Sequence, residues 1–202
     1  MKFLFIPAKS KSKINNGKIE EISKSLPQNI GIAYSIQFEE LAKEVRKLLS
    51  KKHKITSLIQ VLGCSKPKFP KHTSAILLIG SGKFHATSLF FETGLPIYIL
   101  NKEGLEKVSR KDTDALEKRH KTSYLKFLNA NKVGILVSTK PGQQRLAQAL
   151  QFKKKLTNKK SYLFLANNIN TSEFENYNID SWINTACPRL DMDTNVINLS
   201  RL

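Results

Sequence analysis

Residues 75–85 read AILLIGSGKFH, and this stretch decides the fold because it joins two kinds of structure within a few residues. The apolar run at 75–79 is uninterrupted, which is typical of a strand buried on both faces of a parallel sheet. Gly80 and Gly82 follow, and glycine lets the backbone turn tightly and leaves N–H groups available for an anion. A helix is expected to begin just after this turn. The stretch therefore predicts one strand–turn–helix element of an α/β protein.

The same alternation of apolar runs and amphipathic stretches continues along the chain. Short apolar runs predict strands at residues 2–6, 30–35, 57–62, 75–80, 96–100, 132–138, 161–166, 181–184 and 195–199. Apolar residues that recur every three or four positions predict further helices at residues 38–49, within 102–131 and at 143–156. Strands that alternate with helices imply an α/β fold with mainly parallel sheets.

The strand–helix pattern begins again near residue 132, so we expect two small consecutive α/β units. Residues 1–26 are assigned to a leading strand and a basic linker. Residues 27–130 form the first predicted unit, which carries Cys64, and residues 131–202 form the second, which carries Cys187. A chain of 202 residues is long enough for two such hydrophobic cores.

The composition argues against a membrane or secreted protein, but it does not identify the binding partner. The chain has a net charge of +18 and two cysteines. It has no apolar run long enough to span a bilayer and no secretory signal, so a cytoplasmic protein without membrane association is expected. The positive charge fits a nucleic acid or another polyanion, an acidic protein partner, or simply a lysine-rich sequence. All three explanations stay open at this level.

Both cysteines follow directly on predicted strands. Cys64 comes after strand 57–62, and Cys187 lies in the segment NTACPR after strand 181–184. Ligands of open α/β sheets bind beyond the carboxyl ends of strands, so two units packed face to face would bring both thiols to one point. Asn184, Thr185 and Arg189 would supply hydrogen bonds and positive charge that favour a thiolate. The alternative is a pair of buried structural thiols.

Two glycine-containing loops carry the remaining candidate binding residues. GSGKFH holds Gly80, Gly82 and His85, and STKPGQQR holds the others. The second loop would suit a carboxylate or phosphate because it combines basic side chains with the start of a helix. Its candidate residues are Ser138, Lys140, Gly142, Gln143 and Arg145. Taken alone, each loop fits an ordinary strand-to-helix turn equally well.

Taken together, four motifs in order resemble one known family. VLGC at 61–64, IGSGKFH at 79–85, GILVSTKPGQQR at 134–145 and WINTACPR at 182–189 are similar to segments of archaeal-type diphthamide synthase, the 2-(3-amino-3-carboxypropyl)histidine synthase family. The resemblance extends over nearly the whole chain and corresponds to the middle and C-terminal domains of the family.

The resemblance implies a fold, a cofactor and an activity. Family members have three similar α/β domains, each of which gives one cysteine to a shared 4Fe–4S cluster. The cluster's open iron binds S-adenosylmethionine, from which a 3-amino-3-carboxypropyl group passes to a histidine of elongation factor 2 by radical chemistry. By position, Cys64 and Cys187 correspond to two of the three cluster ligands. The two glycine-containing loops and Arg189 correspond to segments near S-adenosylmethionine.

The resemblance also sets expectations about assembly. The family's first domain and its cysteine have no counterpart here, so we expect a separate polypeptide to supply both, within a hetero- or homo-oligomer. This chain would then be the C-terminal part of a split synthase. Two alternatives remain: an accessory subunit that carries a cluster or passes electrons to a complete synthase, and a non-catalytic basic α/β protein that binds RNA or a translation factor.

Overall fold

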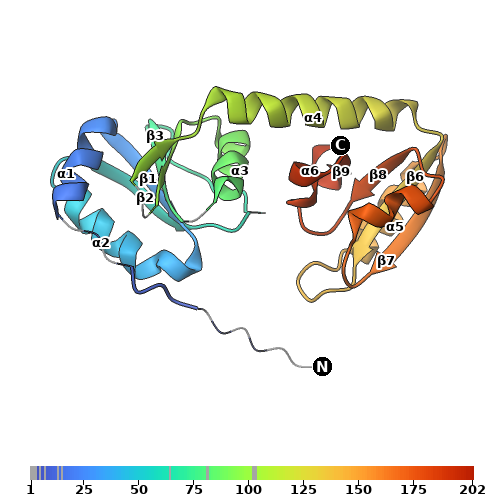
Figure 1. The fold of residues 1–202 in the computed structure, drawn as a ribbon, viewed down its shortest axis with the longest axis horizontal. Helices are drawn as coiled ribbons and strands as arrows, with labels where there is room; N and C mark the ends of the chain where they lie inside the picture. Colours follow the sequence, from blue (N-terminus) through green and yellow to red (C-terminus); the bar gives the residue numbers. More distant parts are fainter. Residues whose placement is uncertain are drawn as a thin grey trace. The chain divides into compact units, whose positions relative to one another are not determined.

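The chain divides into two units, Met1–Thr113 (unit 1) and Asp114–Leu202 (unit 2). Each unit contains a mainly parallel sheet that is covered by helices. The protein is represented by a computed structural model, which describes residues 4, 6, 8–12, 14, 16–63, 65–80, 82–101 and 104–202, without the side chains of residues 16 and 193. Figure 1 shows the order of the elements within each unit. The mixed α/β architecture confirms the predicted fold class.

Unit 1 has a sheet of strand order β2-β1-β3-β4-β5 among its described residues. Its strands are β1 (Asn29–Tyr34), β2 (Lys54–Gln60), β3 (Ala75–Ile79), β4 (Ile97–Leu100) and β5 (Leu105–Lys107). The first four are parallel, and β5 runs antiparallel to β4. Its helices are α1 (Asn16–Ser25), α2 (Glu39–Leu49) after a short 3-10 turn (Ile36–Phe38), and α3 (Lys83–Thr93).

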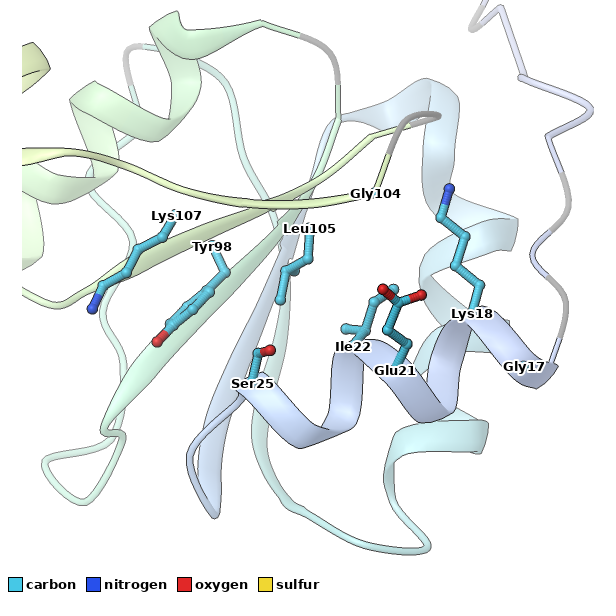
Figure 2. A pocket seen from close by; sticks show the side chains of 9 residues that line it. All are labelled: Gly17, Lys18, Glu21, Ile22, Ser25, Tyr98, Gly104, Leu105 and Lys107. Atoms are coloured by element: carbon cyan, nitrogen blue, oxygen red, sulfur yellow. The ribbon is translucent and has the colours of Figure 1, made fainter.

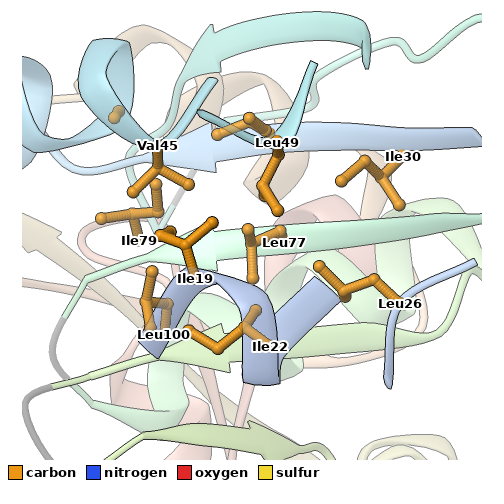
Figure 3. Packing of buried hydrophobic residues seen from close by; sticks show 11 residues of the cluster. Ile19, Ile22, Leu26, Ile30, Val45, Leu49, Leu77, Ile79 and Leu100 are labelled. Carbon is orange, nitrogen blue, oxygen red and sulfur yellow. The ribbon is translucent and has the colours of Figure 1, made fainter. Parts of the chain in front are cut away.

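Each face of this sheet is covered by different helices. Buried apolar side chains of α1 and α2 pack on one face of β1 and β3, and Figure 3 shows this cluster around Ile19, Val45 and Leu77. Residues of α3, among them Ala86 and Leu89, pack on the opposite face. Each strand of the sheet's centre is therefore buried on both sides, as the apolar run at 75–79 predicts.

Helix α1 corrects the assignment of residues 1–26. The basic linker expected there is in large part a helix, whose Ile19 and Ile22 are buried in the core. His53 ties the end of this helix to the start of β2: its Nε2 lies 2.7 Å from the Ser23 hydroxyl and its Nδ1 lies 2.9 Å from the Pro27 carbonyl. The strand expected at residues 2–6 falls mostly outside the described residues.

Unit 2 repeats the strand order of unit 1, with the described strands arranged as β7-β6-β8-β9. Its strands are β6 (Lys132–Ser138), β7 (Lys160–Ala166), β8 (Ser181–Asn184) and β9 (Val196–Asn198), and all are parallel. Its helices are α5 (Leu146–Lys155) and α6 (Leu190–Asp193), with 3-10 turns at Thr171–Asn176 and Leu199–Arg201. Helix α4 (Arg110–Asn129) runs across the boundary between the units, so this boundary lies near the start of α4 and not after residue 130 as expected.

The core of unit 2 lies on both faces of its sheet. Ala149 of α5 and Phe127 of α4 pack against β6, β8 and β9 on one face. On the other face Trp182 stacks on Phe174 with ring centroids 4.2 Å apart, and Phe164 meets it edge-on. At the amino ends of the strands, the Asp180 carboxylate accepts hydrogen bonds from the backbone N–H groups of Asn131 and Lys132.

Candidate functional site

The turn that carries Cys187 is tied to the end of a neighbouring strand. It follows β8 directly, and Thr185 anchors it to β6: the backbone N–H and the hydroxyl of Thr185 both donate to the Leu136 carbonyl, at 3.1 and 2.7 Å. Thr185 is buried, so both bonds lie away from water. The position of the turn relative to β6 is therefore fixed by the sheet itself.

Asn184 fixes the shape of the turn. Its amide nitrogen donates to the Cys187 carbonyl at 2.8 Å, and its amide oxygen accepts from the Ala186 N–H at 2.9 Å. The Leu190 N–H donates to the same Cys187 carbonyl at 3.2 Å. Cys187 carries a free thiol on a partly buried side chain. A thiol on such a turn can serve as a metal ligand once deprotonated.

The STKPGQQR loop follows β6 and forms a tight turn before α5. The Ser138 hydroxyl accepts from the Lys140 N–H at 3.2 Å and donates to the Asn167 carbonyl at 3.4 Å, so it shapes the turn. Gly142 has a φ of 77°, which glycine adopts without strain. The Gln143 N–H donates to the Lys140 carbonyl at 3.1 Å. Helix α5 begins at Leu146, three positions later than the sequence predicts, with Arg145 as its exposed N-cap residue.

These two loops meet where the strand order of unit 2 reverses. The chain passes from β6 to β7 on one side and then returns to β8 on the other side of β6. Open α/β sheets bind ligands at this point, beyond the carboxyl ends of the strands. The candidate residues Ser138, Lys140, Cys187 and Arg189 lie on the two loops that leave those strand ends. Arg189 is exposed at the start of α6.

In unit 1 the structure brings the other two motifs into contact. Gly63 of VLGC lies against the ring of Phe84 from GSGKFH so closely that a Cβ atom on Gly63 would overlap the ring. Phe84 in turn packs edge-on against His85, with ring centroids 5.3 Å apart. Gly80 directly follows β3, and Gly82, with a φ of 93°, precedes α3 as its N-cap. Cys64 lies outside the described residues, so its meeting with Cys187 stays a prediction.

Lys83 in this loop has acidic partners that the motif does not indicate. Its Nζ lies 3.5 Å from a carboxylate oxygen of Asp112 and 3.5 Å from one of Glu106. These two charges, Asp112 before Glu106, raise the pKa of Lys83 above its usual value. The Lys83 ammonium group therefore pairs with acidic side chains of unit 1, which makes it less available to an anionic ligand.

The two cysteines follow strands that occupy different places in the shared strand order. Both units share one strand order, in which β1, β2 and β3 correspond to β6, β7 and β8. Cys187 follows β8, whose counterpart is β3, whereas Cys64 follows β2, whose counterpart is the edge strand β7. The segment of unit 1 that corresponds to the Cys187 turn is thus the GSGKFH loop. The order of strands in space, which the sequence does not show, causes this difference.

A groove of about 600 Å³ in unit 1 lies apart from the predicted cofactor loops. Figure 2 shows it between α1 and the β4–β5 hairpin, lined among others by Lys18, Glu21, Tyr98 and Lys107. None of the predicted site residues lines it. Within the part of the chain that the structure describes, no helix is long and apolar enough to cross a membrane, and no three His, Cys, Asp or Glu side chains are grouped to hold a metal ion.

Two polar residues that support the Cys187 turn are not among the residues that the motifs indicate. Asp191 and Asn198 are both buried and join the hydrogen bonds of Asn184. A signal for Asn198 was present, because an asparagine inside the apolar run VINL is costly to bury unless its amide is paired. Asp191 carried no comparable signal, since it lies in the polar segment DMDTN.

Comparisons with known proteins agree with the motif order. The family model for diphthamide synthesis proteins (Diphthamide_syn) matches residues 1–197. The 2-(3-amino-3-carboxypropyl)histidine synthase of Pyrococcus horikoshii is 26% identical over 94% of this chain and 59% of its own length. That of Methanocaldococcus jannaschii is 28% identical over 98% of this chain and 58% of its own length. The chain thus spans about three fifths of the curated relatives it matches.

The fold of the chain is also similar to that of a solved structure. The crystal structure of Dph2 from Pyrococcus horikoshii with a 4Fe-4S cluster superimposes with a TM-score of 0.76 at 26% identity, over 90% of this chain and 58% of that one. At 90% of this chain, the structural match includes parts of both units, and the family model spans the four motifs. On this evidence the chain belongs to the diphthamide synthesis protein family.

Proposed function

We propose that this chain provides two ligands, Cys64 and Cys187, to the 4Fe–4S cluster of a diphthamide synthase. The observation that carries the proposal is the Cys187 turn, which Thr185 anchors to β6 at the point where the strand order reverses. The thiol is free and partly buried, which suits a soft iron ligand. A crystal structure of Dph2, with which the chain shares its fold, is described as containing such a cluster.

The third cluster ligand comes, in this proposal, from the part of the family protein that the chain does not match. The curated relatives extend well beyond the matched length. A cluster with one open iron needs three protein thiolates, so the two cysteines of this sequence are one short. We infer that a separate polypeptide supplies the family's first domain and its cysteine. The assembled protein would then be a hetero-oligomer.

The loop after β6 is the proposed site for the amino-acid moiety of S-adenosylmethionine. Lys140 and Arg145 carry positive charge at opposite ends of this turn, and Arg189 lies on the neighbouring turn after β8. Basic side chains beside backbone N–H groups favour a carboxylate. In unit 1, the loop that holds Gly80, Gly82 and His85 is a second proposed contact with S-adenosylmethionine. When bound and reduced, the cluster supplies the electron that cleaves a carbon–sulfur bond of S-adenosylmethionine.

Elongation factor 2 is the proposed acceptor of the 3-amino-3-carboxypropyl group. The net charge of +18 would steer the chain toward an acidic surface of the factor. Electrostatic association weakens with added salt because ions screen the charges. Binding of elongation factor 2 is therefore expected to fall as the salt concentration rises. Tight, salt-sensitive binding to generic duplex DNA, with no affinity for the factor, would favour a non-catalytic nucleic-acid-binding protein instead.

The test is anaerobic reconstitution with iron and sulfide, with and without a polypeptide that carries the family's first domain. The mixture should acquire the broad visible absorption of a 4Fe–4S cluster and, with dithionite and S-adenosylmethionine, modify elongation factor 2. Cys64→Ala and Cys187→Ala should abolish both. Asp180→Asn is the matched control, because Asp180 lies at the opposite end of the unit 2 sheet. If a mixture in which Cys64 and Cys187 are both replaced still modified the factor, the proposal would be refuted.

A further inference from the structure

Asp191 is a buried carboxylate that the proposed chemistry does not use. Its side chain is 3% exposed, and three side chains converge on one of its oxygens, Oδ2. The Asn198 amide nitrogen donates to it at 2.5 Å, and Arg201 Nε donates at 3.1 Å. His120 Nε2 lies 3.2 Å from the same oxygen. Burying a carboxylate is costly unless it is paired, so this cluster calls for an explanation.

The cluster leads by hydrogen bonds to the cysteine turn. Asn198 also donates from its amide nitrogen to the Pro188 carbonyl at 2.9 Å, and its amide oxygen accepts from the Asn184 amide nitrogen at 2.6 Å. Asn184 in turn donates to the Cys187 carbonyl and accepts from the Ala186 N–H. Two amides thus connect the carboxylate to the backbone on both sides of Cys187.

The carboxylate and the backbone of the turn together set the direction of this chain of bonds. A carboxylate oxygen of Asp191 and the Pro188 carbonyl both accept, so Asn198 turns its NH₂ group toward them and its oxygen toward Asn184. Asn184 then presents its NH₂ group to Asn198 and to the Cys187 carbonyl, which leaves its oxygen for the Ala186 N–H. The carboxylate gives this set its charge-assisted bond, and reversal of either amide would leave a buried donor facing a donor.

We propose that Asp191 is a positioning residue, which holds the Cys187 turn in one conformation before any metal is bound. The inference rests on the proposed role of Cys187 as a cluster ligand. Partners that orient a metal ligand restrict its motion and so reduce the entropy lost on binding. Arg201, from the C-terminal 3-10 turn, supplies positive charge beside the carboxylate. The sulfur is thus presented by a network that begins at Asp191 and ends at the backbone of the turn.

The test uses the metal-free chain with Cys64→Ala, so that Cys187 is the one remaining cysteine of the sequence. Asp191→Asn has the same shape and can still accept a hydrogen bond, but it removes the charge from the bond to Asn198. Amide hydrogen exchange should rise about tenfold at Ala186 and Leu190, since a charge-assisted hydrogen bond is lost. Alkylation of Cys187 by iodoacetamide should accelerate in parallel, while exchange in β6 stays unchanged.

Two further variants keep the test decisive. Asp180→Asn makes the same chemical change at the other end of the sheet and should leave exchange in the turn unaltered. Asn198→Ala removes the relay between Asp191 and Asn184 and should open the turn even if Asp191→Asn fails to fold. Unchanged exchange at Ala186 in a folded Asp191→Asn or Asn198→Ala protein would overturn the proposal, as would a uniform rise that includes β6. Failure to assemble a cluster would refute the proposed function, but it would not change the result of these measurements, because they use the metal-free chain.

Discussion

Replacing Gly63 by alanine is expected to destabilise unit 1 by forcing the Phe84 ring out of its place. Three ring carbons of Phe84 lie too close to the position that a Cβ atom on Gly63 would take, and the farthest of them, Cδ1, is only 2.8 Å away. The ring must swing aside because a backbone-bound methyl group cannot. Overpacking of this kind costs about 1–3 kcal/mol of the free energy of unfolding.

Urea denaturation followed by circular dichroism measures this cost as a lower midpoint at unchanged slope. The melting temperature should fall by about 2–12 °C, since each kcal/mol corresponds to about 2–4 °C in a chain of this size. Phe84→Leu alone should also destabilise, but in the double variant the penalty of Gly63→Ala should shrink by about 0.5 kcal/mol or more.

Gly80→Ala is the matched control for this cycle. A Cβ atom there meets only the Ser35 hydroxyl oxygen at 3.4 Å, which is an ordinary contact. Its effect on the free energy of unfolding should stay within about 0.5 kcal/mol. Equal effects of Gly63→Ala and Gly80→Ala, or strictly additive effects of Gly63→Ala and Phe84→Leu, would refute the reasoning that VLGC and GSGKFH are held together by this packing.

Three further changes probe the rest of the fold. Gly134→Ala should displace the indole of Trp182 and lower the free energy of unfolding by about 1–3 kcal/mol. Because Trp182 is the one tryptophan of the sequence, a shift of the fluorescence emission would report this displacement. His53→Ala leaves two partly buried partners unpaired, so it should cost about 1 kcal/mol and speed hydrogen exchange in α1; unaltered exchange there would contradict the tie between α1 and β2. Hydrogen bonds from the backbone N–H groups of Lys132 and Asn131 lower the pKa of Asp180 below its usual value of 3.8. The Asp180 carboxylate therefore contributes fully to stability above pH 3.8, and this contribution is lost as the pH falls through the lower pKa of the folded state. The stability difference between the native chain and Asp180→Asn should accordingly vanish in acid, and a difference that persists there would speak against this carboxylate as its source.

Much of the fold could be predicted because buried parallel strands have a plain signature. The apolar runs at 75–79 and 132–138 became β3 and β6, and the amphipathic stretch at 38–49 became α2 with Ala42, Val45 and Leu49 buried. The sequence predicts a linker where α1 lies, although Ile19, Ile22 and Leu26 recur at helical spacing, because the first 26 residues are rich in lysine and contain Asn and Gly.

The candidate site could be predicted less completely, for a physical reason. Motifs name residues that follow strands, but the sequence does not reveal which strands are neighbours. Thr185 reaches Leu136, and Gly63 reaches Phe84, only because of the order in which the strands pair. The antiparallel β5 was likewise hidden in the charged stretch at 102–131, since it is short and lies at the sheet's edge.

The unequal placement of the two cysteines bears on the history of the chain. If the two units arose from one ancestral unit by gene duplication, then residues at corresponding strand ends descend from one ancestral residue. Cys64 follows β2 and Cys187 follows the counterpart of β3, so the two thiols do not share such an ancestor. Either one of them was acquired after the duplication, or an ancestral unit that held both lost a different one in each copy. In both cases a shared metal site would use two different corners of one repeated scaffold.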